Sequence, residues 1–118
     1  MKKILVLDDD TDILILMQMT LKIHEFDVEA ISRWQDIDES ISKFNPDLIM
    51  LDVSLNGADG RDICKRLKLS AETGHIPIIL FSANAEMGNN IGEFHAQAFI
   101  AKPYELAHLI STIKSHLN

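Results

Sequence analysis

The sequence has a single cysteine, Cys64, so the chain cannot build an internal disulfide framework. Basic residues are few: 11 Lys and Arg stand against 18 Asp and Glu, and the formal net charge of −7 argues against direct binding to nucleic acid. No apolar run approaches the roughly 20 residues of a membrane-spanning helix, and the run at residues 4–7 is too short for a signal peptide. These absences favour a soluble, cytoplasmic protein that does not contact a membrane.

The chain length of 118 residues predicts one domain, spanning residues 1–118. Hydrophobic residues make up 47% and charged residues 25%, as in ordinary globular proteins. A chain of this size buries roughly two-thirds of its unfolded surface. It therefore needs no disulfide to hold a core, and we expect Cys64 to be a small buried hydrophobe.

Short apolar runs alternate with helical patterns along the chain. The runs predict strands at residues 4–7, 26–31, 48–52, 76–81 and 98–101. Helical periodicity lies between them, although Gly88, Asn89, Asn90 and Gly92 make residues 85–96 poor helix material, and we expect a short, mobile helix there. Five strands alternating with five helices predict an α/β fold, a doubly wound parallel sheet with helices on both faces.

The first predicted helix has more apolar residues than one face needs. Asp10 or Thr11 is its expected N-cap. We expect its buried face to consist of Ile13, Leu16, Met17, Thr20 and Leu21. Leu14, Ile15 and Met19 lie off that face, and two interpretations stay open: a docking surface for a partner, or burial under neighbouring helices.

Polar side chains follow the ends of several predicted strands. Asp8 and Asp9 follow the first, Asp52 ends the third, Ser82 follows the fourth and Lys102 follows the fifth. In a parallel sheet these ends share one edge, so the five residues should converge. Crowded carboxylates repel one another, and oxygen ligands without His or Cys suit Mg²⁺. This pattern predicts a phosphoryl-transfer site.

Five motifs occur in order along the chain: Ile-Leu-Val-Leu-Asp-Asp, Asp-Leu-Ile-Met-Leu-Asp, Ala-Asp-Gly, Phe-Ser-Ala and Ala-Lys-Pro-Tyr. With this ordered set the chain resembles the response-regulator receiver domain of two-component signalling. The resemblance implies a flavodoxin-like (βα)5 sheet of strand order 2-1-3-4-5. It also implies that Asp52 accepts a phosphoryl group from a sensor histidine kinase or histidine phosphotransfer protein. Such a domain is a self-phosphorylating and self-dephosphorylating switch rather than a turnover enzyme.

The resemblance also assigns roles around Asp52. Asp9, Asp52 and the backbone carbonyl of Ser54 would bind Mg²⁺, and Asp8 would act largely through water. Lys102 would pair with Asp52 or its phosphoryl group, before a cis peptide at Pro103.

A coupled movement would carry the signal. Ser82 would move to hydrogen-bond the phosphoryl group, and Phe99 would turn inward. The altered surface would bind a downstream effector protein or domain. An alternative reading makes Phe99 an ordinary core residue.

Some residues depart from the family pattern. Asn56 and Ala58 stand where the family usually has Pro and Met, and Phe99 lacks the hydroxyl of the frequent Tyr. These departures leave the chemistry intact and put the form of the output surface in question.

Other functions remain to be compared with this one. A small aspartate-dependent Mg²⁺ phosphatase would use Asp8 and Asp10 as an Asp-x-Asp motif, but Asp12 stands where that family usually has Thr or Val. A flavin or nucleotide binder would need a phosphate loop where this chain has three aspartates. A receiver-like interaction module that works without phosphorylation is the third alternative.

Overall fold

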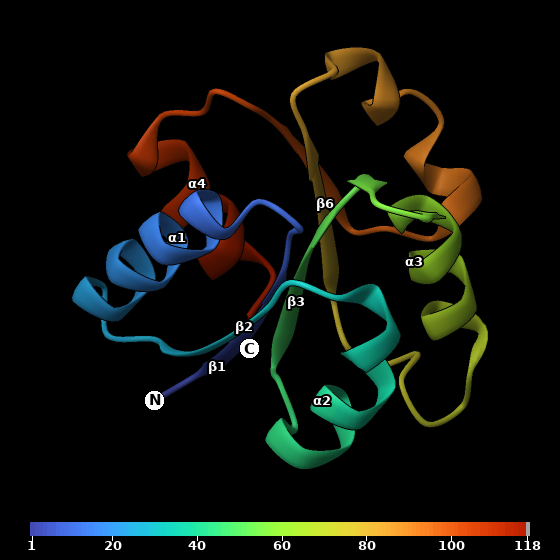
Figure 1. The fold of residues 1–118 in the computed structure, drawn as a ribbon, viewed down its shortest axis with the longest axis horizontal. Helices are drawn as coiled ribbons and strands as arrows, with labels where there is room; N and C mark the ends of the chain where they lie inside the picture. Colours follow the sequence, from blue (N-terminus) through green and yellow to red (C-terminus); the bar gives the residue numbers. More distant parts are fainter. Residues whose placement is uncertain (118) are drawn as a thin grey trace.

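The five apolar runs form one parallel sheet in the computed structural model, which describes residues 1–117 (Figure 1). Its strands are β1 (Lys3–Leu7), β2 (Asp27–Ile31), β3 (Leu48–Asp52), β6 (Ile78–Ser82) and β7 (Ala98–Ala101). Their order across the sheet is β2-β1-β3-β6-β7, and all neighbouring pairs are parallel. This is the predicted doubly wound, flavodoxin-like order 2-1-3-4-5, so the fold prediction is confirmed.

Helices cover both faces of the sheet, as Figure 1 shows. On one face lie α1 (Thr11–Ile23) and α4 (Leu106–Ser115), and on the other α2 (Ile37–Phe44) and α3 (Gly60–Leu69). Each face has its own apolar cluster, one centred under α1 and α4 and the other under α2 and α3. Every residue of β3 and β6 is buried, which explains why these strands are almost continuously apolar.

Residues 85–96 do not form the predicted helix. Two short 3-10 helices, η2 (Ala85–Gly88) and η3 (Ile91–Phe94), take its place, so the described chain has four α-helices instead of five. Asn90 and His95, which flank η3, have positive φ angles of 60° and 62°. The glycines and asparagines lower helix propensity enough that the segment breaks into single turns.

The predicted buried face of α1 was partly wrong. Asp10 is the N-cap, since its side chain accepts from the backbone N–H groups of Asp12 and Ile13. Leu16, predicted to be buried, is 59% exposed, whereas Leu14, for which burial was one of two open interpretations, is only 6% exposed. The buried stripe is Leu14, Met17 and Leu21, and the exposed apolar stripe is Ile15, Leu16, Met19 and Ile23. The helix is apolar on both sides, so periodicity alone could not decide which side faces the sheet.

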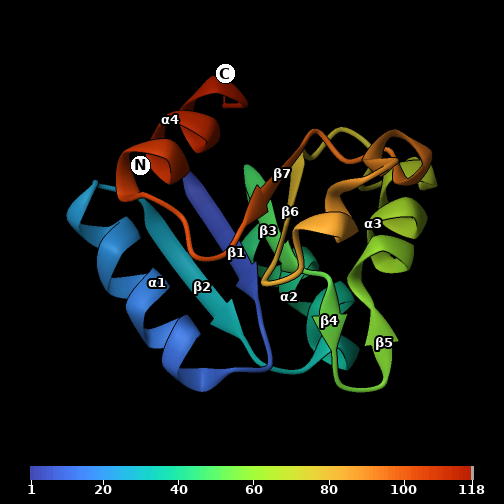
Figure 2. The same ribbon diagram turned by 90° about the horizontal axis from the view of Figure 1, so that it is seen from above.

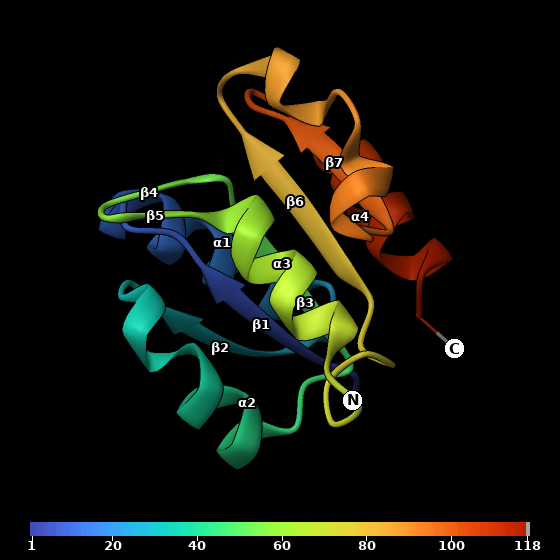
Figure 3. The same cartoon turned by 90° about the vertical axis from the view of Figure 1, so that its right-hand side faces the viewer.

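A small hairpin extends from the carboxyl edge of the sheet (Figures 2 and 3). Its strands, β4 (Ser54–Leu55) and β5 (Ala58–Asp59), pair antiparallel around a turn in which Gly57 has a φ of +87°. The apolar runs of the sequence predicted no strand in this segment. After the hairpin, Gly60 begins α3 so close to β3 that a Cβ at this position would lie 2.0 Å from the backbone oxygen of Asp52.

No helix in the described part of the chain is long and apolar enough to cross a membrane.

Candidate functional site

Three carboxylates gather at the carboxyl edge of the sheet. Asp8 and Asp9 directly follow β1, and Asp52 is the last residue of β3, the neighbouring strand. One carboxylate oxygen from each lies within 4.8 Å of the others. Asp8 and Asp52 are buried, at 1% and 5% exposure, whereas Asp9 is exposed. The topology thus brings together the three aspartates that the sequence placed at strand ends.

Lys102 supplies the positive charge of this cluster. It follows β7, and its Nζ lies 2.9 Å from Asp8 Oδ2 and 3.7 Å from Asp52 Oδ1. The ammonium group also lies 4.4 Å from the centre of the Phe81 ring. Its shorter contact is therefore with Asp8, although the resemblance pairs it with Asp52. The Lys102–Pro103 peptide is cis, as expected.

Burial and crowding make Asp52 harder to ionise. Desolvation, followed by the negative charge of Asp8, raises the pKa of Asp52 from 3.8 to about 6. Lys102 and the backbone N–H of Ser54 oppose the shift. Desolvation and the charge of Asp8 also raise the pKa of Tyr104, whose hydroxyl lies 3.7 Å from Met17 Sδ. At neutral pH Asp52 is mainly ionised. Its buried negative charge is unfavourable, and a bound cation would stabilise it.

The two expected switch residues lie in different environments. Ser82 ends β6, is buried, and its Oγ accepts a hydrogen bond from the Asn84 backbone N–H at 3.1 Å. Phe99 lies half-buried on β7 in the apolar cluster under α3. Its ring packs on η2, since a Cβ at Gly88 would be 2.5 Å from Phe99 Cδ2. Cys64 is buried, as predicted.

Sequence reasoning missed two residues beside the cluster. The backbone N–H of Asn56, in the hairpin turn, donates to Asp9 Oδ2 at 3.0 Å. The backbone oxygen of Asn56 in turn accepts a hydrogen bond from Trp34 Nε1 at 3.1 Å. The adjacent Asn-Gly pair is a turn signal that could have predicted the hairpin, but nothing in the sequence connects Trp34 to it.

The acidic cluster fits a magnesium ion. Its donors are carboxylate oxygens, the ligands that Mg²⁺ prefers, and within residues 1–117 they form the one group of three or more such side chains close enough to share an ion. Burial and then the charge of Asp8 raise the pKa of Asp52, and a bound cation would favour its ionised form.

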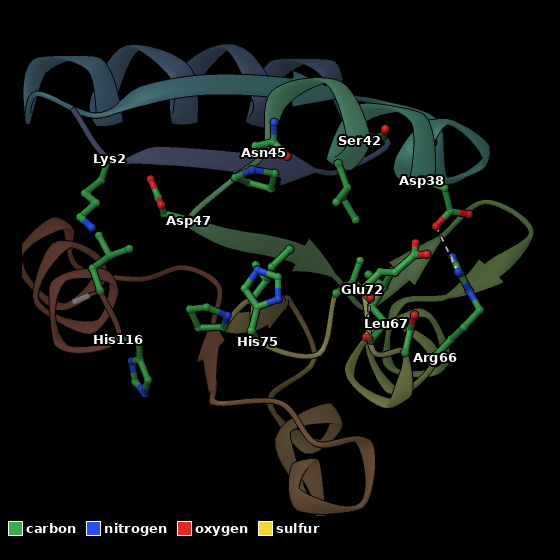
Figure 4. Close-up of a pocket in the computed structure, with 17 residues that line it drawn as sticks. Lys2, Asp38, Ser42, Asn45, Asp47, Arg66, Leu67, Glu72, His75 and His116 are labelled. Atoms are coloured by element: carbon green, nitrogen blue, oxygen red, sulfur yellow. Dashed lines mark hydrogen bonds and ion pairs between the residues drawn. The ribbon is translucent and has the colours of Figure 1, made fainter.

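A separate pocket of about 640 Å³ lies at the opposite, amino-terminal edge of the sheet (Figure 4). Its walls combine acidic and basic side chains, among them Asp47, His75 and the ion pair of Arg66 with Asp38 at 3.1 Å. Because both signs of charge are present, the pocket lining favours neither an anionic nor a cationic ligand. None of the predicted site residues lines it, so the chemistry concentrates at the carboxyl edge.

The carboxyl edge of this flavodoxin-like sheet thus carries three aspartates, a serine and a lysine. The family model of the response regulator receiver domain matches residues 4–114, and the chain belongs to this family. Its members work as switches in two-component signalling.

Individual relatives agree with this assignment. The chain is 29% identical over 117 residues to the phosphate regulon transcriptional regulatory protein PhoB of Rhizobium meliloti (strain 1021), covering 98% of this chain and 52% of PhoB. The chain therefore spans about half the length of this curated relative. The BeF3-activated N-terminal receiver domain of Klebsiella pneumoniae RstA is similar in structure, with a TM-score of 0.88, 29% identity and 99% of each chain covered.

A third relative shares the fold. The response regulator protein TrrA of Thermotoga maritima, in complex with Mg²⁺-BeF, has a TM-score of 0.89 and 22% identity, with 99% of this chain and 100% of that chain covered.

Proposed function

We propose that Asp52 accepts a phosphoryl group and that the resulting aspartyl phosphate switches the surface of the domain. The observation that carries this proposal is the position of Asp52, buried at the end of β3 between Asp8, Asp9 and Lys102. An ionised oxygen of Asp52 attacks the phosphorus of a phosphohistidine. The phosphorus–nitrogen bond breaks, and its electron pair leaves with the imidazole.

The other residues of the site neutralise and orient charge. Asp9, Asp52 and the backbone carbonyl of Ser54 would hold Mg²⁺ directly, and Asp8 would hold it through water. When bound, the ion supplies positive charge to the phosphoryl oxygens. Lys102, already within 3.7 Å of Asp52, offsets the negative charge that the phosphoryl group adds.

We propose that Ser82 and Phe99 transmit the switch. Ser82 ends the strand next to β3 and is buried at the same edge as Asp52, so its hydroxyl is suited to bind a phosphoryl oxygen. Phe99 pairs with Leu80, two residues before Ser82, on the neighbouring strand β7, where a rotation of the ring would alter its contact with η2. Phosphorylation then shifts a population between two states, limited by its differential stabilisation of the active one.

The exposed apolar stripe of α1 supports a protein phosphodonor. Its residues, Ile15, Leu16, Met19 and Ile23, begin little more than one helical turn after Asp10, beside the acidic cluster. We propose that a sensor histidine kinase or phosphotransfer protein docks on this stripe and that a downstream effector binds the β7 side of the domain. The proposed role is therefore that of a cytoplasmic switch, not of a turnover enzyme.

The test is the intact mass of the protein after incubation with Mg²⁺ and acetyl phosphate. We expect a gain of one phosphoryl group, about 80 Da, that requires Mg²⁺ and is absent in Asp52→Asn. If the wild type shows no adduct and also fails to bind beryllofluoride, the phosphoacceptor proposal is wrong, and the alternative of a phosphorylation-independent interaction module takes its place.

A further inference from the structure

Two hydrogen bonds link the acidic cluster to the single tryptophan of the chain. Asn56 donates its backbone N–H to Asp9 Oδ2 at 3.0 Å, and Trp34 Nε1 donates to the backbone oxygen of Asn56 at 3.1 Å. Trp34 begins η1 (Trp34–Asp36), which follows β2, while Asn56 lies in the hairpin after β3. The two bonds thus join three loops at the carboxyl edge of the sheet. We call them the Trp34–Asn56–Asp9 chain.

The turn geometry frees the Asn56 N–H for this contact. Leu55 pairs with Ala58 across the hairpin, which makes Asn56 and Gly57 the two central residues of the turn. The N–H of the first central residue is not used in the ladder of such a hairpin. A Cβ at Gly57 would lie 3.6 Å from Trp34 Nε1, so the indole edge lies directly against the turn.

The identity of residue 56 decides whether the bond to Asp9 exists. Receiver domains usually carry proline at this position, and proline has no N–H to donate. In this chain Asn56 supplies the donor. Asp9 is the exposed member of the cluster, so without the bond its side chain has more rotamer freedom to lose when it binds an ion.

We infer that Asn56 and Trp34 are positioning residues that orient Asp9 for a divalent cation and couple occupancy of the site to the tryptophan. This rests on the proposed Mg²⁺ site. The Asn56 N–H engages one carboxylate oxygen of Asp9 and leaves the other free for an ion. Such outer-shell hydrogen bonds orient metal ligands and raise metal affinity.

The experiment is an NMR titration of the isolated domain with Mg²⁺ and no phosphodonor. Because Trp34 is the single tryptophan, its indole N–H signal needs no assignment, and we expect Mg²⁺ to shift it in the wild type. Asn56→Pro removes the N–H, and proline is common at the first central position of a turn with glycine at the second. Asn56→Ala is the matched control because it keeps the N–H.

We expect Asn56→Pro to weaken Mg²⁺ binding about 3- to 10-fold and Asn56→Ala to leave it within about twofold of wild type. Trp34→Phe, which keeps an aromatic ring but loses the indole donor, should fall between them.

Equal Mg²⁺ affinity in Asn56→Pro and Asn56→Ala would overturn the inference and leave the metal site standing. Should Asn56→Pro fail to fold, the decision passes to Trp34→Phe and to the wild-type indole signal. The inference is then overturned if Trp34→Phe binds Mg²⁺ with wild-type affinity. It is also overturned if Mg²⁺ does not shift the indole N–H signal of the wild type. If the wild type binds no Mg²⁺, or Asp9→Asn binds it equally well, the proposed metal site itself fails.

Discussion

Replacing Asp52 with Asn should stabilise the folded domain at neutral pH. The pKa of Asp52 rises from 3.8 to about 6 because the side chain is buried next to Asp8. A pKa difference of roughly 2 between the folded and unfolded states means that the ionised carboxylate destabilises the folded state by at most about 3 kcal/mol. Asparagine is neutral, so we expect Asp52→Asn to raise the free energy of unfolding by about 1–3 kcal/mol near pH 7.5 in EDTA.

The stability gained through Asp52→Asn should increase with pH. The raised pKa means that the folded state binds the proton more tightly than the unfolded state, so this group favours folding below pH 3.8 and that contribution is lost as the pH rises through about 6. The advantage of Asp52→Asn is therefore largest above about pH 6.5 and disappears near pH 4.

Urea denaturation across this pH range, with and without Mg²⁺, measures the effect. Asp27→Asn, at an exposed position in β2, controls for the loss of one negative charge. Mg²⁺ should stabilise the wild type more than Asp52→Asn and so narrow the difference. A variant that is no more stable than wild type at pH 7.5, or a gain that persists unchanged to pH 4, refutes the reasoning.

Three further predictions concern a site residue, a close backbone approach and the buried cysteine. Lys102→Met leaves two buried carboxylates without their cation and should cost about 3 kcal/mol in urea denaturation, with recovery when Asp8→Asn is added; no recovery would contradict the charge argument. Gly60→Ala forces a Cβ against the backbone oxygen of Asp52 and should lower the free energy of unfolding by about 3 kcal/mol, and a variant with wild-type stability would contradict the close approach. Burial raises the pKa of Cys64 to about 12, so iodoacetamide should alkylate it only after urea is added; rapid reaction of the folded protein would show an open α3.

The sequence predicted the sheet well because its interior strands are buried on both faces. Continuous apolar runs such as those of β3 and β6 are typical of buried strands. The observed bounds of both strands differ from the predicted bounds by two residues or less. In β6, the strand begins at Ile78 instead of Ile76. Pro77 cannot donate to a ladder, although its oxygen accepts from Ile49 N–H.

The failures at α1 and at the site share one physical cause: the deciding contacts are tertiary. Leu14 and Leu16 are equally apolar, and packing against the sheet buries one and exposes the other. The same holds at the site. Strand ends predicted that Asp8, Asp9 and Asp52 would converge, but not that Lys102 would lie closer to Asp8 than to Asp52.

The position of β1 in the interior of the sheet sets the order in which a growing polypeptide can assemble the site. β1 pairs with β2 and β3, so the three aspartates come together once residue 52 is available. β6 and β7 then add at one side, and Lys102 arrives last, after β7. During synthesis from the N-terminus, the assembling sheet therefore carries three adjacent negative charges for some fifty residues before its own cation is made. If the cluster binds the proposed Mg²⁺ during that interval, the ion would balance the carboxylate charges before Lys102 is synthesised.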